Sequence, residues 1–558
     1  MKPLVWINEI EFNDGTKIPL SKNDIIVFVG PNNSGKSLSL KEIEKTTSHL
    51  NYETNKVIKK VTFSKEGSEE ELILYIEKDS IKGNEGQLLG YQFSLNNNNI
   101  KYYWSNVLSL GLQDLKSYFL NLLSTERRLA AANPPRAIAL TSEPPSHPIH
   151  ILQKNDELEE VFSNYFKQAF GTDLIVHRNA GNQVPLYVGK KPIPEQGKDR
   201  VSTSYLKELE KLDLLHLQGD GMRSFVGVLL NAFISTYSIL LIDEPEAFLH
   251  PPQARLLGKM ISKNMSSERQ TFLSTHSESF LKGLLDTDSK NLKVVRLQRE
   301  GNINKVSLLD NTDINTIWSD SLLRHSNILD GLFHSKVVIC ESDSDSRFFS
   351  SILSSQFEDT NQISPDILFI NVGGKHRIPV AIKALKNLNV PISVVSDFDV
   401  LNNIHPLKAI YEDLDGNWNE IKSDWELVKS EIERKRPEFL TMEAKEEIEN
   451  ILEGITDRIF PKEKVREIQQ VFKKASPWTE AKAVGKAFIP SGNATQAFER
   501  LQLKFKDKGL FIVEVGELEG FVRSVGNHGP KWINEVLIKD QKNDPELEIA
   551  RQFIKQII

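Results

Sequence analysis

The sequence predicts an α/β protein made of two successive units in which strands and helices alternate. Three observations lead to this prediction. Residues 25–29 (IIVFV) form a continuous apolar run, typical of a strand buried on both faces, and a glycine-containing loop and a helical pattern follow. Residues 239–242 and 271–276 contain two more short apolar runs, both ending in polar residues. A new strand at residues 336–340 (KVVIC) opens a second series of the same kind.

Length and composition limit the class of protein. At ~150 residues per domain, a chain of 558 residues predicts three or four domains. The apolar runs are far shorter than the ~20 residues needed to cross a bilayer, and the first residues, MKPLVWINEIEF, carry acids where a signal peptide would be apolar. We therefore expect no membrane partner. The single cysteine, Cys340, fits the reducing cytoplasm. A net charge of −7 argues against wrapping nucleic acid over the whole surface, although one basic groove is compatible with it.

The first predicted strand leads into a loop of the pattern G-x4-G-K-S. Glycines let backbone N–H groups surround phosphate oxygens, and the following helix adds its partial positive charge. Lys36 is expected to reach the β- and γ-phosphates, and Ser37 to bind Mg²⁺. The predicted nucleotide-binding residues of the loop are Gly30, Asn32, Asn33, Ser34, Gly35, Lys36 and Ser37.

The strand at 239–242 ends in Asp243 and Glu244, the partners that such a loop needs. We expect Asp243 to hold the Mg²⁺ shell and Glu244 to orient or deprotonate the attacking water. His276, at the end of the next predicted strand, is a candidate contact to the γ-phosphate.

Between the loop and the acids, the segment LQGDGMRSFVGVLLNAF is a glycine turn that opens a helix. Together with DEPEAFLHP it resembles the ABC-type ATPases of the SMC/RecF/OLD kind. This resemblance implies that Gly219, Gly221 and Ser224 act on the nucleotide of a second subunit, although QGDGMRS departs from the common LSGGQ wording. It also implies a homodimer, and a glutamine that contacts the metal, for which Gln87 and Gln92 are both candidates.

The second unit carries acids at the ends of its strands. Glu341 follows the strand at 336–340, and Asp345, four residues later, shares a helical face with it if the helix starts early. A Gly-Gly turn follows the next strand, and the third ends in Asp397 and Asp399, which point the same way in an extended chain. Carboxylates gathered at one sheet edge suit Mg²⁺ or Mn²⁺.

This E…GG…DxD order resembles a TOPRIM domain, the metal-dependent module of topoisomerases, primases and OLD-family nucleases. By the same resemblance, Glu517 and Glu519 would supply a second metal position, and Lys531 would stabilise charge at the scissile phosphate, with Lys539 nearby.

The whole arrangement resembles the OLD (overcoming lysogenization defect) family, which includes Gabija-like and retron-associated anti-phage effectors. The expected domains are an ABC-type ATPase at 1–104 and 201–330 with a helical dimerisation insert at 105–200, and a TOPRIM domain at 331–403 and 506–558 with a helical insertion at 404–505. The resemblance implies ATP as cofactor, a homodimer or higher oligomer, and an accessory defence protein or retron RNA or DNA as partner.

The predicted function is ATP-regulated, metal-dependent cleavage of DNA in anti-phage defence. Two alternatives remain open: the same architecture cutting RNA or tRNA, and a non-cleaving ATP-dependent clamp or sensor that acts through a partner. A topoisomerase is disfavoured, since no segment looks like a DNA-gate domain with a nucleophilic tyrosine, and a primase would not need the DEPE acids.

Overall fold

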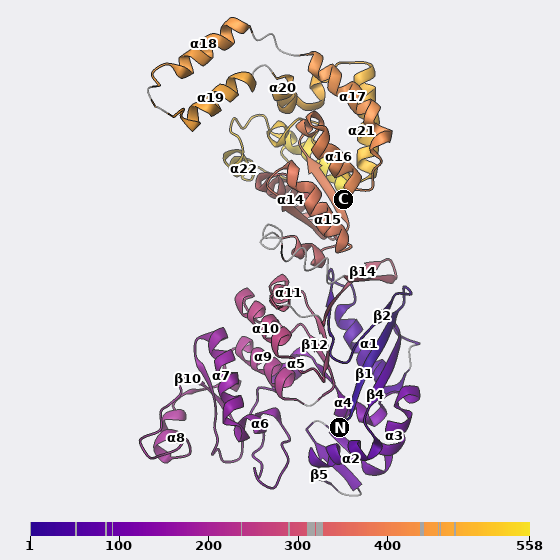
Figure 1. Ribbon diagram of the computed structural model, residues 1–558, viewed down its shortest axis with the longest axis vertical. Helices are drawn as coiled ribbons and strands as arrows, with labels where there is room; N and C mark the ends of the chain where they lie inside the picture. The colour runs from indigo at the N-terminus through magenta and orange to yellow at the C-terminus, as the bar shows by residue number, and fades with distance from the viewer. Residues whose placement is uncertain are drawn as a thin grey trace. The chain divides into compact units, whose positions relative to one another are not determined.

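Two α/β units, Met1–Ser319 and Asp320–Ile558, follow one another along the chain in the computed structural model (Figure 1). The structure describes all residues except 1, 51–52, 84–85, 92, 236, 288–290, 310–318, 320–326, 436–439, 456, 458 and 474–475.

The first unit is organised around a six-stranded sheet with the order β15-β14-β3-β13-β12-β8. Its strands are β3 (Ile25–Val29), β8 (Leu120–Leu123), β12 (Ile239–Asp243), β13 (Gln270–Ser274), β14 (Leu292–Glu300) and β15 (Ile303–Leu309). All neighbours pair in parallel except β14 and β15. The residues of β3 are all buried, as its unbroken apolar run predicts.

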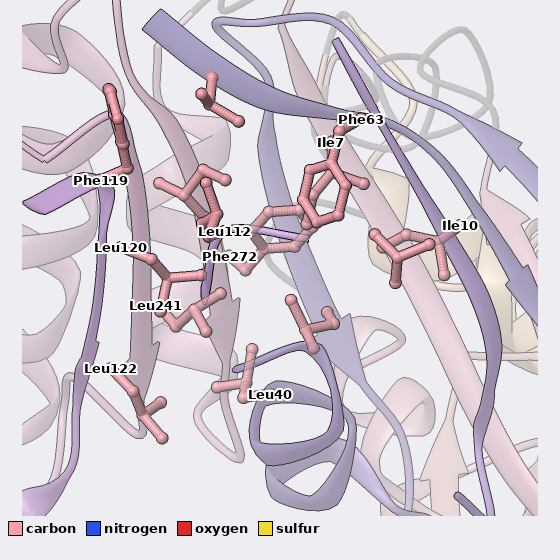
Figure 2. Close-up of a cluster of buried hydrophobic side chains, with 14 of the residues drawn as sticks. Ile7, Ile10, Leu40, Phe63, Leu112, Phe119, Leu120, Leu122, Leu241 and Phe272 are labelled. Carbon is pink, nitrogen blue, oxygen red and sulfur yellow. The ribbon is translucent and has the colours of Figure 1, made fainter. Parts of the chain in front are cut away.

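Helices and a second sheet cover this six-stranded sheet. The helices are α1 (Lys36–His49), α5 (Thr125–Ala130), α9 (Asp220–Leu229), α10 (Pro251–Asn264) and α11 (Glu278–Leu285). The antiparallel sheet β2-β1-β4 consists of β1 (Leu4–Phe12), β2 (Lys17–Pro19) and β4 (Ile58–Glu66). Figure 2 shows side chains of β1, α1 and β4 meeting those of the central strands, with Ile7, Leu40 and Phe272 among them. This apolar contact holds α1, and with it the glycine loop, against the sheet.

Smaller elements complete the first unit. They are α2 (Glu69–Lys78), β5 (Ser80–Lys82), β6 (Gln87–Gly90), β7 (Phe93–Asn96), α3 (Asn97–Leu110), α4 (Lys116–Phe119), α6 (Pro148–Lys154), α7 (Asp156–Phe170), β9 (Asp173–Val176), β10 (Leu186–Gly189), α8 (Thr203–Leu209) and β11 (Asp213–Leu214).

The segment predicted as a helical insert, 105–200, differs from its prediction in two ways. It contains β8, which pairs with β12 inside the six-stranded sheet. It also contributes β9 and β10 to an antiparallel sheet with β11, so it is not purely helical. Strands of two to four residues are too short to show a reliable alternating pattern, which is why the helical periodicity of α7 dominates this part of the sequence.

The second unit contains a four-stranded, all-parallel sheet with the order β17-β16-β18-β19. Its strands are β16 (Lys336–Cys340), β17 (Ile367–Asn371), β18 (Ile392–Ser396) and β19 (Leu510–Ile512). The described α-helices outside the insertion are α14 (Asp343–Phe357), α15 (Ile378–Asn387), α22 (Pro530–Val536) and α23 (Glu548–Ile557). Cys340 is buried in the core that α14, α22 and α23 share with this sheet.

The described elements between β18 and β19 are helices. They are α16 (Ile404–Asp413), α17 (Trp418–Arg434), α18 (Thr441–Leu452), α19 (Lys462–Lys473), α20 (Pro477–Val484) and α21 (Asn493–Asp507), with short 3-10 turns. The predicted apolar stripe of α17, from Trp418 to Ile432, is buried, and α17 packs along α21 (Figure 1).

Two glycines allow the backbone at α20 to pack directly against the backbone of the loop that follows β19. A Cβ atom at Gly516 would lie 2.1 Å from the carbonyl oxygen of Lys482, and one at Gly485 would lie 2.1 Å from that of Glu514. Both glycines have positive φ angles, 108° and 63°, which L side chains rarely adopt.

We predict that Gly516→Ala lowers the free energy of unfolding of the second unit by about 1–3 kcal/mol, because the added methyl group clashes with backbone at a strained φ. Chemical denaturation of the full-length protein measures this change. Gly526→Ala is the matched control, since a Cβ there meets nothing within 4 Å. Equal stability of the two variants would contradict the close approach of α20.

Candidate functional site

The glycine loop joins β3 to α1 and lines a cavity of about 400 Å³. The cavity is formed by residues 32–38 together with His276 and Arg299. Lys36 is buried, and its Nζ donates to the carbonyl oxygens of Gly30 at 2.7 Å and Pro31 at 2.8 Å. The loop therefore has the polar, concave form that a nucleotide phosphate chain requires. Arg299 comes from β14, which pairs with β3, and no local motif marks it in the sequence.

Parallel pairing brings the predicted acids beside the loop. In the order β3-β13-β12, Asp243 ends β12, and its carboxylate accepts a hydrogen bond from the hydroxyl of Ser274 at the end of β13. Glu244 Oε1 lies 3.4 Å from His276 Nε2. Burial and the nearby charge of Lys36 lower the pKa of His276, so the neutral imidazole is favoured. Asp243, Glu244 and His276 thus converge as their positions after successive strands predict.

Sequence reasoning overlooked Glu246, which lies behind His276. Its Oε1 accepts from the Thr275 hydroxyl at 2.6 Å and from the His276 N–H at 3.0 Å. Burial raises the pKa of Glu246 to about 7. Glu246 is the last residue of the motif DEPE, so its position two residues after Glu244 could have indicated a role at this site.

The glycine turn lies at the start of α9, but one of its predicted residues is misassigned. Gly219 caps α9, and a Cβ there would meet open space. Gly221 packs near the carbonyl oxygen of Phe248. Ser224, in contrast, is fully buried, and its hydroxyl accepts from Arg128 Nε at 2.8 Å. The prediction that Ser224 contacts a partner's nucleotide is wrong, because the helix turns this side chain inward.

Neither candidate for the glutamine that would contact the metal is placed near the glycine loop by the described residues. Gln87 lies in β6, in the small antiparallel sheet β5-β6-β7 rather than in the six-stranded sheet. Gln92 lies outside the described residues.

Three carboxylates of the second unit meet at the carboxyl edge of its sheet. One ligand atom each of Glu341, Asp397 and Asp399 lies within 4.8 Å of the others. Glu341 follows β16, and its Oε1 accepts from the Asp397 N–H at 3.1 Å and from the Ser396 hydroxyl. The neighbouring strands β16 and β18 therefore fix the spacing of these side chains.

The electrostatics of this cluster fit a divalent cation. Burial and the charge of Glu341 raise the pKa of Asp397 well above its usual range. Asp399 Oδ2 pairs with Lys375 Nζ at 2.8 Å, whereas its buried Oδ1 has no hydrogen-bond partner in the described part of the chain. Crowded carboxylates with an unsatisfied oxygen are what a hard cation such as Mg²⁺ or Mn²⁺ would satisfy.

Glu517 and Glu519 form a second cluster together with His528, which the sequence did not predict. His528 Nδ1 lies 3.5 Å from a carboxylate oxygen of Glu519 and 4.0 Å from one of Glu517. Glu519 also accepts from the Gly529 N–H at 2.8 Å, which holds the loop of His528 over the pair. The two carboxylates suit Mg²⁺ or Mn²⁺, and the imidazole adds a ligand of the kind that transition metals prefer.

Lys482 lies between the two clusters. Its Nζ is 3.2 Å from Asp397 and 3.6 Å from Glu517. Burial opposes the charge of this ammonium group, yet the surrounding Asp397, Asp399 and Glu517 outweigh the burial and raise its pKa. Lys482 is located on α20, in the helical insertion, so no motif near the acids could have identified it.

The two lysines considered from the sequence lie elsewhere. Lys531 is exposed at the start of α22 and takes no part in the ion pairs that join the two clusters. Lys539 pairs with Asp544 and Glu546. The proposed role of Lys531, stabilising charge at the scissile phosphate, stays a prediction, and the lysine that the structure places between the two clusters is Lys482.

The geometry expected for Asp345 also needs correction. Helix α14 begins at Asp343 with Ser342 as its cap, so Glu341 precedes the helix and cannot share a face with Asp345. Asp345 instead accepts from the Ser342 N–H at 2.8 Å. Burial and the nearby charges of Glu341 and Glu519 raise the pKa of Asp345 to about 6. Asp345 therefore lies near a residue of each cluster, although it belongs to neither cluster.

Two family models match the chain. Residues 90–282 match the model described as "AAA domain, putative AbiEii toxin, Type IV TA system", and residues 332–399 match "Overcoming lysogenization defect protein-like, TOPRIM domain". The chain is an OLD-family fusion of an ATPase domain and a TOPRIM domain. The matched TOPRIM residues of this OLD-family protein include Glu341, Asp397 and Asp399.

Other similarities cover less or are more distant. An uncharacterized protein of Methanocaldococcus jannaschii, MJECL11, is 32% identical over 87 residues, which are 15% of this chain and 76% of that protein. The SMC head bound to the C-winged helix domain of ScpA covers 55% of this chain and 99% of its own, at 13% identity and a TM-score of 0.32. The SMC head domain from Thermotoga maritima covers 56% and 100%, at 12% identity and a TM-score of 0.29. The family assignment depends on the two family models.

None of the described helices of the OLD-family chain has the length and apolar character needed to cross a membrane.

We predict that Lys482→Ala lowers the phosphodiester cleavage expected of a TOPRIM domain about a hundredfold, the scale of losing one charged donor near a reacting phosphate. Cleavage rates of purified variants measure the effect. Lys486→Ala is the matched control, since Lys486 lies four residues later, in the 3-10 turn that follows α20, and pairs with Glu499. If Lys531→Ala is inactive and Lys482→Ala is not, the assignment of the lysine is reversed.

Proposed function

We propose that this protein is an ATP-regulated nuclease that uses divalent metal ions to cleave the phosphodiester bonds of DNA. The observation that carries the proposal is the pair of clusters, Glu341/Asp397/Asp399 and Glu517/Glu519/His528, joined by the ammonium group of Lys482. The OLD-family fusion of an ATPase with a TOPRIM domain supports the same conclusion, and the family resemblance favours a role in anti-phage defence.

The residues of the second unit have distinct proposed roles. The two carboxylate clusters would hold divalent ions, which when bound activate water and stabilise the leaving oxygen of a phosphodiester. Lys482 would keep the carboxylates together and offer positive charge to the scissile phosphate. Ser396 and the Asp397 N–H hold one oxygen of Glu341, which leaves its other oxygen for the ion.

The first unit would bind and hydrolyse ATP. Residues 32–38 would surround the phosphates, Ser37 and Asp243 would hold Mg²⁺, and Glu244 would orient the attacking water next to His276. The neutral state of His276 suits a hydrogen-bond contact to the γ-phosphate.

The cleavage test combines metal, nucleotide and substrate. Purified protein is incubated with plasmid, linear DNA and tRNA, with Mg²⁺ or Mn²⁺ or neither, and with or without ATP. We expect DNA to be cut only when a divalent ion is present, and ATP to change the rate. Cleavage of tRNA alone would correct the substrate to RNA, and intact substrates in every lane would favour an ATP-dependent clamp or sensor.

Glu341→Ala and Asp397→Ala give the matched variants for this test. Each is expected to lose cleavage while nucleotide binding, measured by calorimetry, stays unchanged, because the residues belong to the second unit. Cleavage by both variants at the wild-type rate would refute the assignment of the metal site.

We further propose that ATP joins two copies of the first unit through the face around the glycine turn. Gly219 meets open space there, and two large apolar side chains near the turn are exposed, Leu217 at 72% and Phe248 at 54%. Contiguous exposed apolar groups commonly mark contact surfaces, and Phe248 lies next to Gly221 of the same turn.

Light scattering tests this assembly. We expect the Glu244→Gln variant, which should bind ATP without hydrolysing it, to double its mass when ATP is added. Leu217→Asp should prevent the change, and Lys36→Ala should weaken ATP binding by about tenfold or more through loss of a charge-assisted contact. An ATP-independent mass would argue against the nucleotide-bridged dimer.

A further inference from the structure

Arg128 is a completely buried arginine beside the proposed ATP site, and no sequence motif assigns it a role. It lies in α5 with 0% exposure. Its guanidinium donates to Ser224 Oγ at 2.8 Å, to the carbonyl oxygen of Asp243 at 2.6 Å and to Thr125 Oγ1 at 3.3 Å. The hydrogen bonds of the guanidinium go to neutral acceptors, and the nearby carboxylates of Glu246, Asp243 and Glu244 offset part of the cost of burying its charge.

The carbonyl that Arg128 binds belongs to the peptide group between Asp243 and Glu244. The N–H of the same peptide group donates to the carbonyl oxygen of Ser274 at 3.0 Å. The peptide plane is therefore held from both sides, by α5 on one and by β13 on the other. Because a peptide group is rigid and planar, holding both of its ends also fixes the direction in which the chain continues.

This fixed plane coincides with backbone strain at Glu244. The residue has φ 48°, in the left-handed region that non-glycine residues rarely occupy. Such a conformation is strained and persists only where the surroundings enforce it. Glu244 Oε1 lies 3.4 Å from Nε2 of His276, a residue that lines the loop cavity.

Arg128 also connects this peptide to α9, the helix that starts at the glycine turn. Ser224 is on α9, and a Cβ atom at Gly227 would lie only 2.0 Å from the carbonyl oxygen of Arg128. The backbones of helices α5 and α9 thus pack directly against each other. A displacement of α9 would therefore move the Arg128 guanidinium, which binds the Asp243–Glu244 peptide group.

We propose that Arg128 is a positioning residue for ATP hydrolysis: it holds the Asp243–Glu244 peptide so that Glu244 is directed at the nucleotide, and it links that geometry to α9. The inference rests on the proposed ATP hydrolysis. It adds that Arg128 transmits the position of α9, the helix that begins at the glycine turn, to the rate of that hydrolysis.

The test compares Arg128→Lys with Arg269→Lys. Arg269 is a matched control, because it is also buried, at 4% exposure, and also donates to backbone carbonyls, those of Asn231, Ala232, Ser235 and Tyr237. Steady-state ATP hydrolysis gives kcat and KM for each variant, and thermal unfolding gives their stability.

We expect Arg128→Lys to lower kcat by up to about a hundredfold with KM for ATP nearly unchanged, as a misplaced catalytic group would. Arg269→Lys should lose comparable stability yet keep kcat within about twofold of wild type, since losing structure alone does not misdirect Glu244. Equal kcat for the two variants would overturn the inference.

Ser224→Ala keeps the test decisive if Arg128→Lys does not fold, since it removes only one of the contacts of the guanidinium. A severalfold lower kcat at constant KM supports the link to α9, and an unchanged kcat refutes it. Wild-type protein that binds ATP without hydrolysing it would overturn the proposed hydrolysis itself. Normal hydrolysis in the wild type with no selective effect of the variants would overturn only the role of Arg128.

Discussion

Parallel pairing of strands is the constraint on which both candidate sites depend. In the second unit, β18 pairs with β16 on one side and with β19 on the other, with Ile339 opposite Val394 and Ser396 opposite Ile512. Parallel strands end at the same edge of a sheet, so the residues that follow them must share a small volume. The acids after β16 and β18 meet for this reason, although 56 positions of the chain separate Glu341 from Asp397.

Gathering so many carboxylates has an electrostatic cost that the surrounding structure offsets. Burial and mutual repulsion raise the pKa of Asp397 and of Glu517. Two cations counter this charge, Lys375 at Asp399 and Lys482 between the clusters. Lys482 reaches its place because Gly485 and Gly516 let α20 contact the backbone after β19. The helical insertion is thus part of the site rather than an appendage to it.

In the first unit the candidate site also lies at the carboxyl edge of the sheet. Its main constraint is the direction of one carboxylate, that of Glu244. The strained φ of Glu244 is enforced by hydrogen bonds at both ends of the preceding peptide group. One of these bonds comes from the neighbouring strand β13 and the other from a buried arginine of α5. Strain of this kind is stored where the position of a group matters more than the stability of the backbone around it.

The sequence by itself determined the class of fold, the glycine loop and the residues at the ends of the strands. Buried parallel strands are continuous apolar runs, and the polar residues that follow them occupy predictable positions. The places of Asp243, His276, Glu341 and Asp397 at or just after strand ends could therefore be predicted. The amphipathic stripe of α17 was equally visible, because one helix face is buried along its length.

Only the tertiary structure decided which residues join these groups from distant elements. Lys482, Arg128 and Arg299 reach their sites from helices and strands whose local patterns carry no signal of that contact. The inward direction of Ser224 depends on how α9 packs against α5, and the start of α14 at Asp343, after Glu341, depends on the Ser342 cap. Contacts between side chains far apart in sequence depend on packing, and neither spacing nor periodicity along the chain records how elements pack.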